Sequence, residues 1–133
     1  MTCTSISRRS FLALSAMLPL AVRGRAKKTI PIGLELYSVR NELKKDAAAT
    51  VRAVAQMVYQ CVEFFSPYFD WTEAQAKDMR KLLDDLGMRC FSTHNSSTHI
   101  NPENIGRARE LNLILGSRYV VLASARPKPG PDG

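Results

Sequence analysis

Short apolar segments alternate with longer amphipathic segments over most of this chain, and this alternation restricts its fold more than any other feature. The apolar segments have the length and composition of strands and occupy residues 30–37, 61–65, 88–94 and 118–125. The segments between them repeat apolar residues at helical spacing and occupy residues 41–57, 71–86 and 101–115. A β-α-β-α-β-α-β order is typical of a parallel sheet with right-handed helical crossovers. The sequence therefore predicts an α/β fold.

Residue types at the expected helix starts support this interpretation. Thr72 and Gln75 have the spacing of a capping box at the start of the second helix. Asn101 followed by Pro102 is typical of an N-cap with proline at the first helical position. We therefore expect the second and third helices to begin at these residues.

Two architectures satisfy the order of strands and helices. A doubly wound nucleotide-binding sheet usually has a glycine-rich loop after its first strand, whereas the corresponding stretch here reads YSVRNEL and has no glycine. The alternative is a (β/α)8 barrel of the TIM type, which typically needs about 250 residues. The 133 residues of the chain suffice for about half of one. We predict the first four strands and three helices of a (β/α)8 barrel.

The first 28 residues have the features of an export signal. Arg8 and Arg9 precede an apolar run that is too short to span a bilayer, which needs about 20 apolar residues. An arginine pair before such a run is typical of a twin-arginine signal. We predict a signal segment at 1–28, a barrel domain at 29–133, and export by the twin-arginine machinery. The location would be periplasmic or exported, with a membrane anchor if the signal is not cleaved.

The positive charge of the chain is concentrated in this predicted signal. The net charge is +7, with 19 Lys and Arg against 12 Asp and Glu. Residues 1–28 hold six of the basic residues and no acidic one, which leaves the rest of the chain at about +1. A nucleic-acid-binding domain would need a basic face on its folded part. We therefore expect no nucleic acid as a partner.

The cysteines do not indicate a metal site. Cys61 and Cys90 lie inside apolar strand segments, where a buried free thiol is the ordinary state, although a disulfide is an alternative in an oxidising compartment. Cys3 lies in the predicted signal, and the chain has no CxxC pair. A zinc site built on cysteine is therefore not expected.

Three motifs, IGLELYSVR, CVEFF and STH, lie in the first, second and third predicted strands. In this order they resemble the sugar phosphate isomerase/epimerase family, also known as xylose-isomerase-like TIM barrels. The resemblance implies a barrel enzyme that interconverts or epimerises sugars, inositols or related ketoses. It also implies a divalent metal (Mn, Mg, Co or Zn) in a full-length member, bound by carboxylates and a histidine on later strands. We accordingly expect no metal to be bound by this part of the barrel alone.

The chain departs from the family pattern at Val58 and Cys61, where the family has glycine. Val58 also takes the place that Gly87 and Gly116 hold after the other two helices. Glycine is favoured there because the residue is left-handed. Either Val58 has a positive φ, at a cost of about 1–2 kcal/mol, or the end of this helix is reshaped.

Active sites of such barrels lie at the C-terminal ends of the strands. His94 ends the third predicted strand, Glu63 lies near the end of the second, Tyr37 ends the first, and Arg40 follows it. We predict His94 and Glu63 as catalytic residues, with His94 against substrate and not metal, and Tyr37 and Arg40 as substrate-binding residues. Alternation along the third strand would place Cys90 and Ser92 on the face of His94. His99, in the following polar loop, is expected to face solvent.

Other functions remain open at this stage. The chain could be an exported, non-catalytic carbohydrate-binding or orphan half-barrel. An abasic-site endonuclease-like barrel shares the fold but lacks support, because the basic surface is missing once the signal is set aside. Four strands cannot close a barrel, so we expect this part alone to be inactive. Both edge strands would then be open, and self-association through them is a further expectation.

Overall fold

The computed structural model of the protein describes residues 30–124, so the predicted signal segment and the chain after Ser124 lie outside the described residues. None of the described helices is long and apolar enough to cross a membrane. The elements follow in the order β1 (Gly33–Glu35), η1 (Leu36–Val39), α2 (Arg40–Lys45), α3 (Ala47–Gln56), β2 (Cys61–Phe65), η2 (Ser66–Asp70), α4 (Glu73–Asp85), β3 (Arg89–Asn95), α5 (Ile105–Leu115) and β4 (Tyr119–Leu122).

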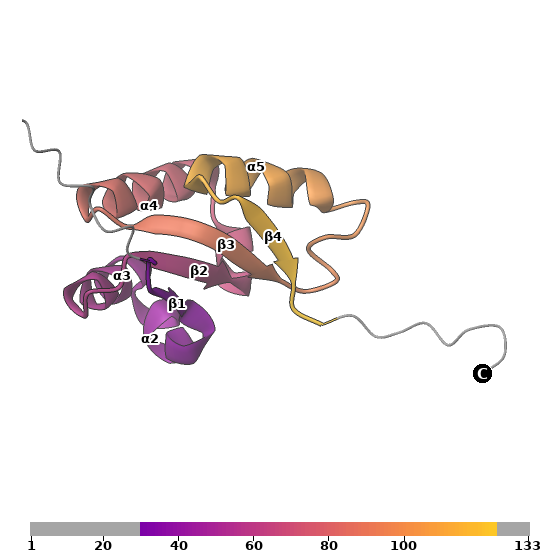
Figure 1. Cartoon of the computed structure of the whole chain (residues 1–133). Coiled ribbons are helices and arrows are strands. Elements are labelled where there is room, and N and C mark those ends of the chain that lie inside the picture. Colours follow the sequence, from indigo (N-terminus) through magenta and orange to yellow (C-terminus); the bar gives the residue numbers. More distant parts are fainter. Residues whose placement is uncertain (1–29, 125–133) are drawn as a thin grey trace, which may run out of the picture.

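The strands form one sheet in the sequential order β1-β2-β3-β4, and every neighbouring pair is parallel (Figure 1). A doubly wound sheet reverses its strand order at a switch point. The described sheet has no reversal, and each strand pairs with the next one along the chain, as in a (β/α)8 barrel. The predicted α/β fold with the first four strands of a barrel is confirmed.

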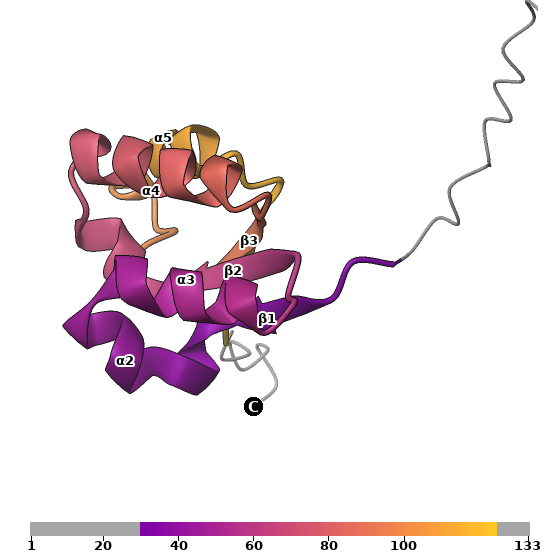
Figure 2. The same ribbon diagram turned by 90° about the vertical axis from the view of Figure 1, so that its left-hand side faces the viewer.

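The helices cover one face of this sheet. Helix α3 contacts α4, and α4 lies side by side with α5, as both views show (Figures 1 and 2). Val62 and Phe64 of β2 are buried in the core beneath these helices. Glu63, which lies between them in sequence, points to the opposite face, and its side chain keeps a quarter of its surface exposed (25%). The sheet therefore has a helix-covered face and a second face whose polar side chains reach solvent.

The predicted helix 41–57 is two helices, which corrects the sequence interpretation. The chain breaks at Asp46, whose backbone is extended (φ −155°, ψ 102°). Its carboxylate accepts a hydrogen bond from the backbone N–H of Ala49 at 2.8 Å and so caps α3. An aspartate side chain competes in this way with helical continuation. The apolar periodicity does not reveal the break, because α2 and α3 both direct their apolar residues toward the core.

Other boundaries also differ from the prediction, among them the end of the first strand and the start of the third predicted helix. The first strand is limited to Gly33–Glu35, because the chain turns into η1 at Leu36, so Tyr37 lies beyond the strand. Helix α5 begins at Ile105 and not at 101. Asn101 instead caps a turn ahead of the helix, where its Oδ1 accepts from the backbone N–H of Asn104 at 2.9 Å.

Several local predictions are confirmed. Thr72 and Gln75 form the complete capping box at the start of α4. Gly87 and Gly116 have φ of 67° and 71°, and Val58 has φ of 69°, the one positive value at a non-glycine residue between 30 and 124. Val58 is also 79% exposed, so no packing offsets its backbone strain. The thiols of Cys61 and Cys90 are free and buried.

Candidate functional site

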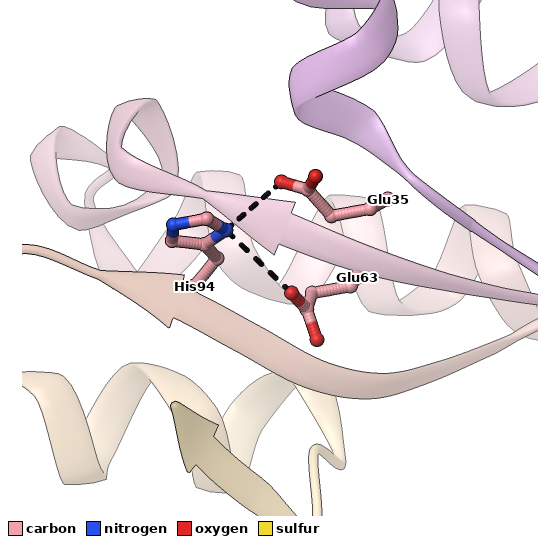
Figure 3. A group of neighbouring side chains, drawn as sticks. All are labelled: Glu35, Glu63 and His94. Carbon is pink, nitrogen blue, oxygen red and sulfur yellow. Dashed lines mark hydrogen bonds and ion pairs between the residues drawn. The ribbon is translucent and has the colours of Figure 1, made fainter. Parts of the chain in front are cut away.

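Three polar side chains from three neighbouring strands point toward one another on the face of the sheet that the helices leave uncovered (Figure 3). Nδ1 of His94 on β3 lies 3.0 Å from Oε1 of Glu35 on β1 and 3.7 Å from Oε1 of Glu63 on β2. One donor atom from each of the three residues lies within 4.8 Å of the other two. The side chains are 25–39% exposed, so the Glu35–Glu63–His94 cluster is half-buried and open to small molecules.

The register of the parallel ladder brings these residues together. Glu35 is the Cα partner of Glu63, and Glu63 is the partner of Ser92. His94 lies two residues after Ser92 and therefore on the same face of β3. The hydroxyl of Ser92 donates a short hydrogen bond to Oε2 of Glu63, which leaves Oε1 of that carboxylate toward His94. The carboxylates and the imidazole are thus positioned by regular strands and not by loops.

The expectation that Cys90 shares this face is wrong. The pairing of β2 with β3 shifts between Val62 and Glu63, so that Val62 pairs with Cys90 but Glu63 pairs with Ser92. The additional residue, Phe91, interrupts the alternation as in a β-bulge. Cys90 consequently packs with core residues beneath α4 and α5.

Neither cysteine has the chemistry of a nucleophile. Burial raises the pKa of the Cys90 thiol to about 12. Burial also raises the pKa of Cys61, although the positive charge of Arg89 opposes this in part. A thiol must ionise to attack, so both groups are inert at neutral pH.

Tyr37 and Arg40 lie beside the cluster, as predicted for residues at the end of the first strand. The Tyr37 ring meets the Phe65 ring edge to face at 5.4 Å and lies 6.3 Å from the His94 ring. The Arg40 guanidinium lies 4.7 Å above the Tyr37 ring and donates to the Tyr37 carbonyl at 3.2 Å. The η1 turn causes this placement, because it folds both residues back toward β2 and β3. All four predicted site residues therefore form one neighbourhood with Phe65.

Sequence reasoning missed Glu35, the third member of the cluster. The available signal was a carboxylate between Leu34 and Leu36 in an otherwise apolar strand. A charged residue there is costly unless it has a partner, and strand alternation places it on the face of Glu63 once the register is known. The apolar pattern predicts a strand that ends at Tyr37, whereas Glu35 is the last residue of β1.

The expectation for His99 also needs correction. Its ring is half-buried and stacks on the Phe69 ring, with centroids 4.3 Å apart and planes 2° from parallel. Its Nδ1 is buried and has no hydrogen-bond partner among the described residues. His99 does not belong to the Glu35–Glu63–His94 cluster. The structure thus separates the two histidines that lie five positions apart in sequence.

Comparison with known proteins supports the fold. A solved structure described as a sugar phosphate isomerase/epimerase from Parabacteroides distasonis ATCC 8503 superposes with a TM-score of 0.56 at 23% identity. The match covers 80% of this chain and 44% of that chain, so this chain spans less than half of its length. At this identity the likeness concerns the fold. No protein-family model matches the chain, and the comparison with curated proteins finds no significant match.

Proposed function

We propose that the chain forms the N-terminal part of a barrel active site that isomerises or epimerises a sugar, inositol or related ketose with the help of a divalent metal. The observation that carries this proposal is the Glu35–Glu63–His94 cluster beside Tyr37 and Arg40 on the uncovered face of the sheet. The likeness in fold to a protein described as a sugar phosphate isomerase/epimerase agrees with it.

The cluster contains the groups that such a reaction needs. Isomerisation beside a carbonyl moves a proton from one carbon atom to its neighbour, and epimerisation removes a proton from a carbon atom and returns one to its opposite face. A carboxylate accepts that proton and an imidazole holds or returns it. Glu63 and His94 supply one of each, with 3.7 Å between Oε1 and Nδ1. A small substrate bound over this face would have both groups within reach of adjacent carbon atoms.

Tyr37 and Arg40 provide a surface for a polyhydroxylated substrate. The Tyr37 side chain is 49% exposed, so its ring offers an apolar contact for the C–H groups of a sugar. The Arg40 guanidinium above it has several N–H donors for hydroxyl or phosphate oxygens. We assign these two residues to substrate binding, with no direct part in proton transfer.

The divalent metal that the family resemblance implies would be held beside this cluster by carboxylates and a histidine on later strands. Such a metal, when bound, would polarise the substrate carbonyl and lower the pKa of the neighbouring hydroxyl. The protein side chains around it would orient the substrate and hold the transferred proton.

The proposal includes export through the predicted twin-arginine signal and a requirement for further strands. Four parallel strands do not close a barrel, so we expect no net turnover by the 133-residue chain alone. Every residue of β4 is exposed, and β1 and β4 are the edges of the described sheet. Self-association through these edges is therefore expected at high concentration.

Substrate binding tests the proposal without needing turnover. A panel of ketoses, ketose phosphates and inososes is titrated into the full 15N-labelled chain, and backbone and imidazole resonances are followed by NMR. At least one compound should shift the resonances of Tyr37 and His94. The effect should weaken strongly in Tyr37→Ala and Arg40→Ala and persist in His99→Gln, a matched control outside the cluster. A panel in which no compound perturbs these residues would contradict a carbohydrate site.

A further inference from the structure

We infer that Glu35, Glu63 and His94 bind one divalent transition-metal cation by themselves, without ligands from any later strand. The three donor groups converge on one point between β1, β2 and β3 (Figure 3). The family resemblance implies metal ligands on later strands, so this is a different site. It departs from the expectations that this part of the barrel binds no metal and that His94 contacts substrate and not metal. It lies within the site of the proposed function but does not rest on the reaction, because binding is measurable without substrate.

Two distances within the cluster are close to those between ligands of one ion. Zn–N and Zn–O bonds are about 2.0–2.2 Å long. Two ligands at such distances, at 90–110° from each other, are therefore about 3.0–3.5 Å apart. Nδ1 of His94 lies 3.0 Å from Oε1 of Glu35 and 3.7 Å from Oε1 of Glu63. The donor atoms of Glu35 and Glu63 lie within 4.8 Å of each other, so side-chain rotation would bring all three atoms to one ion.

The strand register gives an independent reason for a cation here. Glu35 and Glu63 are Cα partners on neighbouring strands, and like charges directly opposite one another destabilise a sheet. The ion pairs that these two carboxylates make among the described residues both involve His94, which is charged only when protonated. A bound divalent cation would neutralise both carboxylates and leave the imidazole as a neutral ligand.

The surroundings hold the ligands in position. The Ser92 hydroxyl binds Oε2 of Glu63, so the other oxygen of that carboxylate remains for the ion. Residues that orient ligands in this way typically change metal affinity by about 10–100-fold when removed. Ser92 is buried and lies on the same strand as His94, so both depend on one backbone segment.

The donor set determines which ions should bind. One imidazole nitrogen with carboxylate oxygens suits Zn²⁺, Co²⁺ and Mn²⁺, whereas Mg²⁺ prefers oxygen ligands and retains much of its water. The three side chains are 25–39% exposed, so an ion can enter from the uncovered face and keep positions for water or substrate oxygens. We expect Zn²⁺ and Co²⁺ to bind in preference to Mg²⁺.

Metal titration of the full chain tests the inference. The chain, carrying Cys3→Ser to remove the thiol outside the described residues, is freed of metal. It is then titrated with Co²⁺ followed by visible absorption and with Zn²⁺ followed by calorimetry. One Co²⁺ per chain should bind with a spectrum of nitrogen and oxygen ligation, Zn²⁺ should displace it, and millimolar Mg²⁺ should not. Glu35→Gln, Glu63→Gln and His94→Gln should each weaken Zn²⁺ binding by more than about tenfold, and Ser92→Ala by about tenfold.

Glu42→Gln and His99→Gln are the matched controls, and both should bind like the parent chain. Circular dichroism of every variant establishes that it is folded. Equal Zn²⁺ affinity of the parent and the folded Glu35→Gln chain would overturn the inference, as would the absence of one-to-one binding. If the chain binds a carbohydrate but no metal, the metal inference fails and the proposed function stands. If it binds metal but no carbohydrate, the proposed function fails and the metal inference stands.

Discussion

Glu35 and Glu63 are direct partners in the parallel pairing of β1 and β2, so two carboxylates lie opposite each other on the exposed face of the sheet. His94 from β3 approaches both through the same nitrogen. Such a pair is unfavourable in a purely structural sheet. Its presence at the end of β1 agrees with the proposed role of this face, because the strand register brings the two carboxylates together.

Zinc should stabilise the chain through this cluster. A ligand that binds only the folded state, at about 100 times its Kd, raises the free energy of unfolding by about 2.7 kcal/mol. Thermal unfolding of the parent chain should therefore shift upward with Zn²⁺. The Glu35→Gln variant should show little shift at the same concentration, while Glu42→Gln should respond like the parent. An equal shift in all three would assign the stabilisation to other residues.

Glycine at position 58 should stabilise the fold. Val58 has φ of 69° and is 79% exposed, so the substitution relieves strain and removes little packing. We expect Val58→Gly to raise the free energy of unfolding by about 1 kcal/mol in urea titration. A side chain added at a matched site, by Gly87→Ala, should lower the free energy of unfolding by a similar amount. The φ of Gly87 is 67°, and a Cβ there would meet no atom within 4 Å, so backbone strain is the expected effect. A lower urea midpoint in Val58→Gly would contradict the claim that the Val58 backbone is strained in the folded state.

The buried thiol of Cys90 should make the fold sensitive to alkali. Burial raises its pKa from 9.0 to about 12, so above pH 9 the unfolded state ionises first and binds fewer protons than the folded state. The free energy of unfolding should then fall between pH 9 and 12, by at most about 1.4 kcal/mol per pH unit. The control is Cys90→Ala, in which this fall in the free energy of unfolding with rising pH should be absent. Parallel pH profiles for the two proteins would show that Cys90 does not contribute.

A buried hydrogen-bond network supports the end of β3 next to His94. The Tyr68 hydroxyl donates to Oδ1 of Asn95 at 2.5 Å and accepts from Nδ2 of Asn112 at 3.1 Å. Tyr68→Phe leaves Oδ1 of Asn95 without a partner among the described residues, whereas Nδ2 of Asn112 keeps its hydrogen bond to the Ala108 carbonyl. The substitution should lower the free energy of unfolding by about 1–3 kcal/mol. Tyr59→Phe is the control and should cost less than about 0.5 kcal/mol, as is usual for substitutions outside such networks. Equal stabilities of the two variants would show that the network is dispensable.

Export should depend on the guanidinium pair of the predicted signal. The twin-arginine route distinguishes arginine from lysine at equal charge. Replacing Arg8 and Arg9 together with lysine should therefore retain the protein in the cytoplasm of a bacterial host, as judged by fractionation. Undiminished export of the lysine variant would show that another route is used.

The sequence by itself determined the alternation of strands and helical segments and the capping box at Thr72, and it indicated a left-handed residue at Val58. These features depend on periodicity and on contacts within a few residues, which the sequence records directly. It also indicated that His94, Glu63, Tyr37 and Arg40 belong to one region, because each follows or ends a parallel strand. The structure brings these four residues together, while their roles remain predictions.

Only the tertiary structure decided which residues complete the cluster and which do not. Glu35 belongs to the cluster because the register places it opposite Glu63. Cys90 does not lie on the face of His94, because the strand pairing shifts at Phe91. The break at Asp46 depends on one side chain taking the N–H of Ala49. Pairing register and competition for hydrogen bonds are settled by contacts between segments, and an alternating pattern of apolar residues does not encode them.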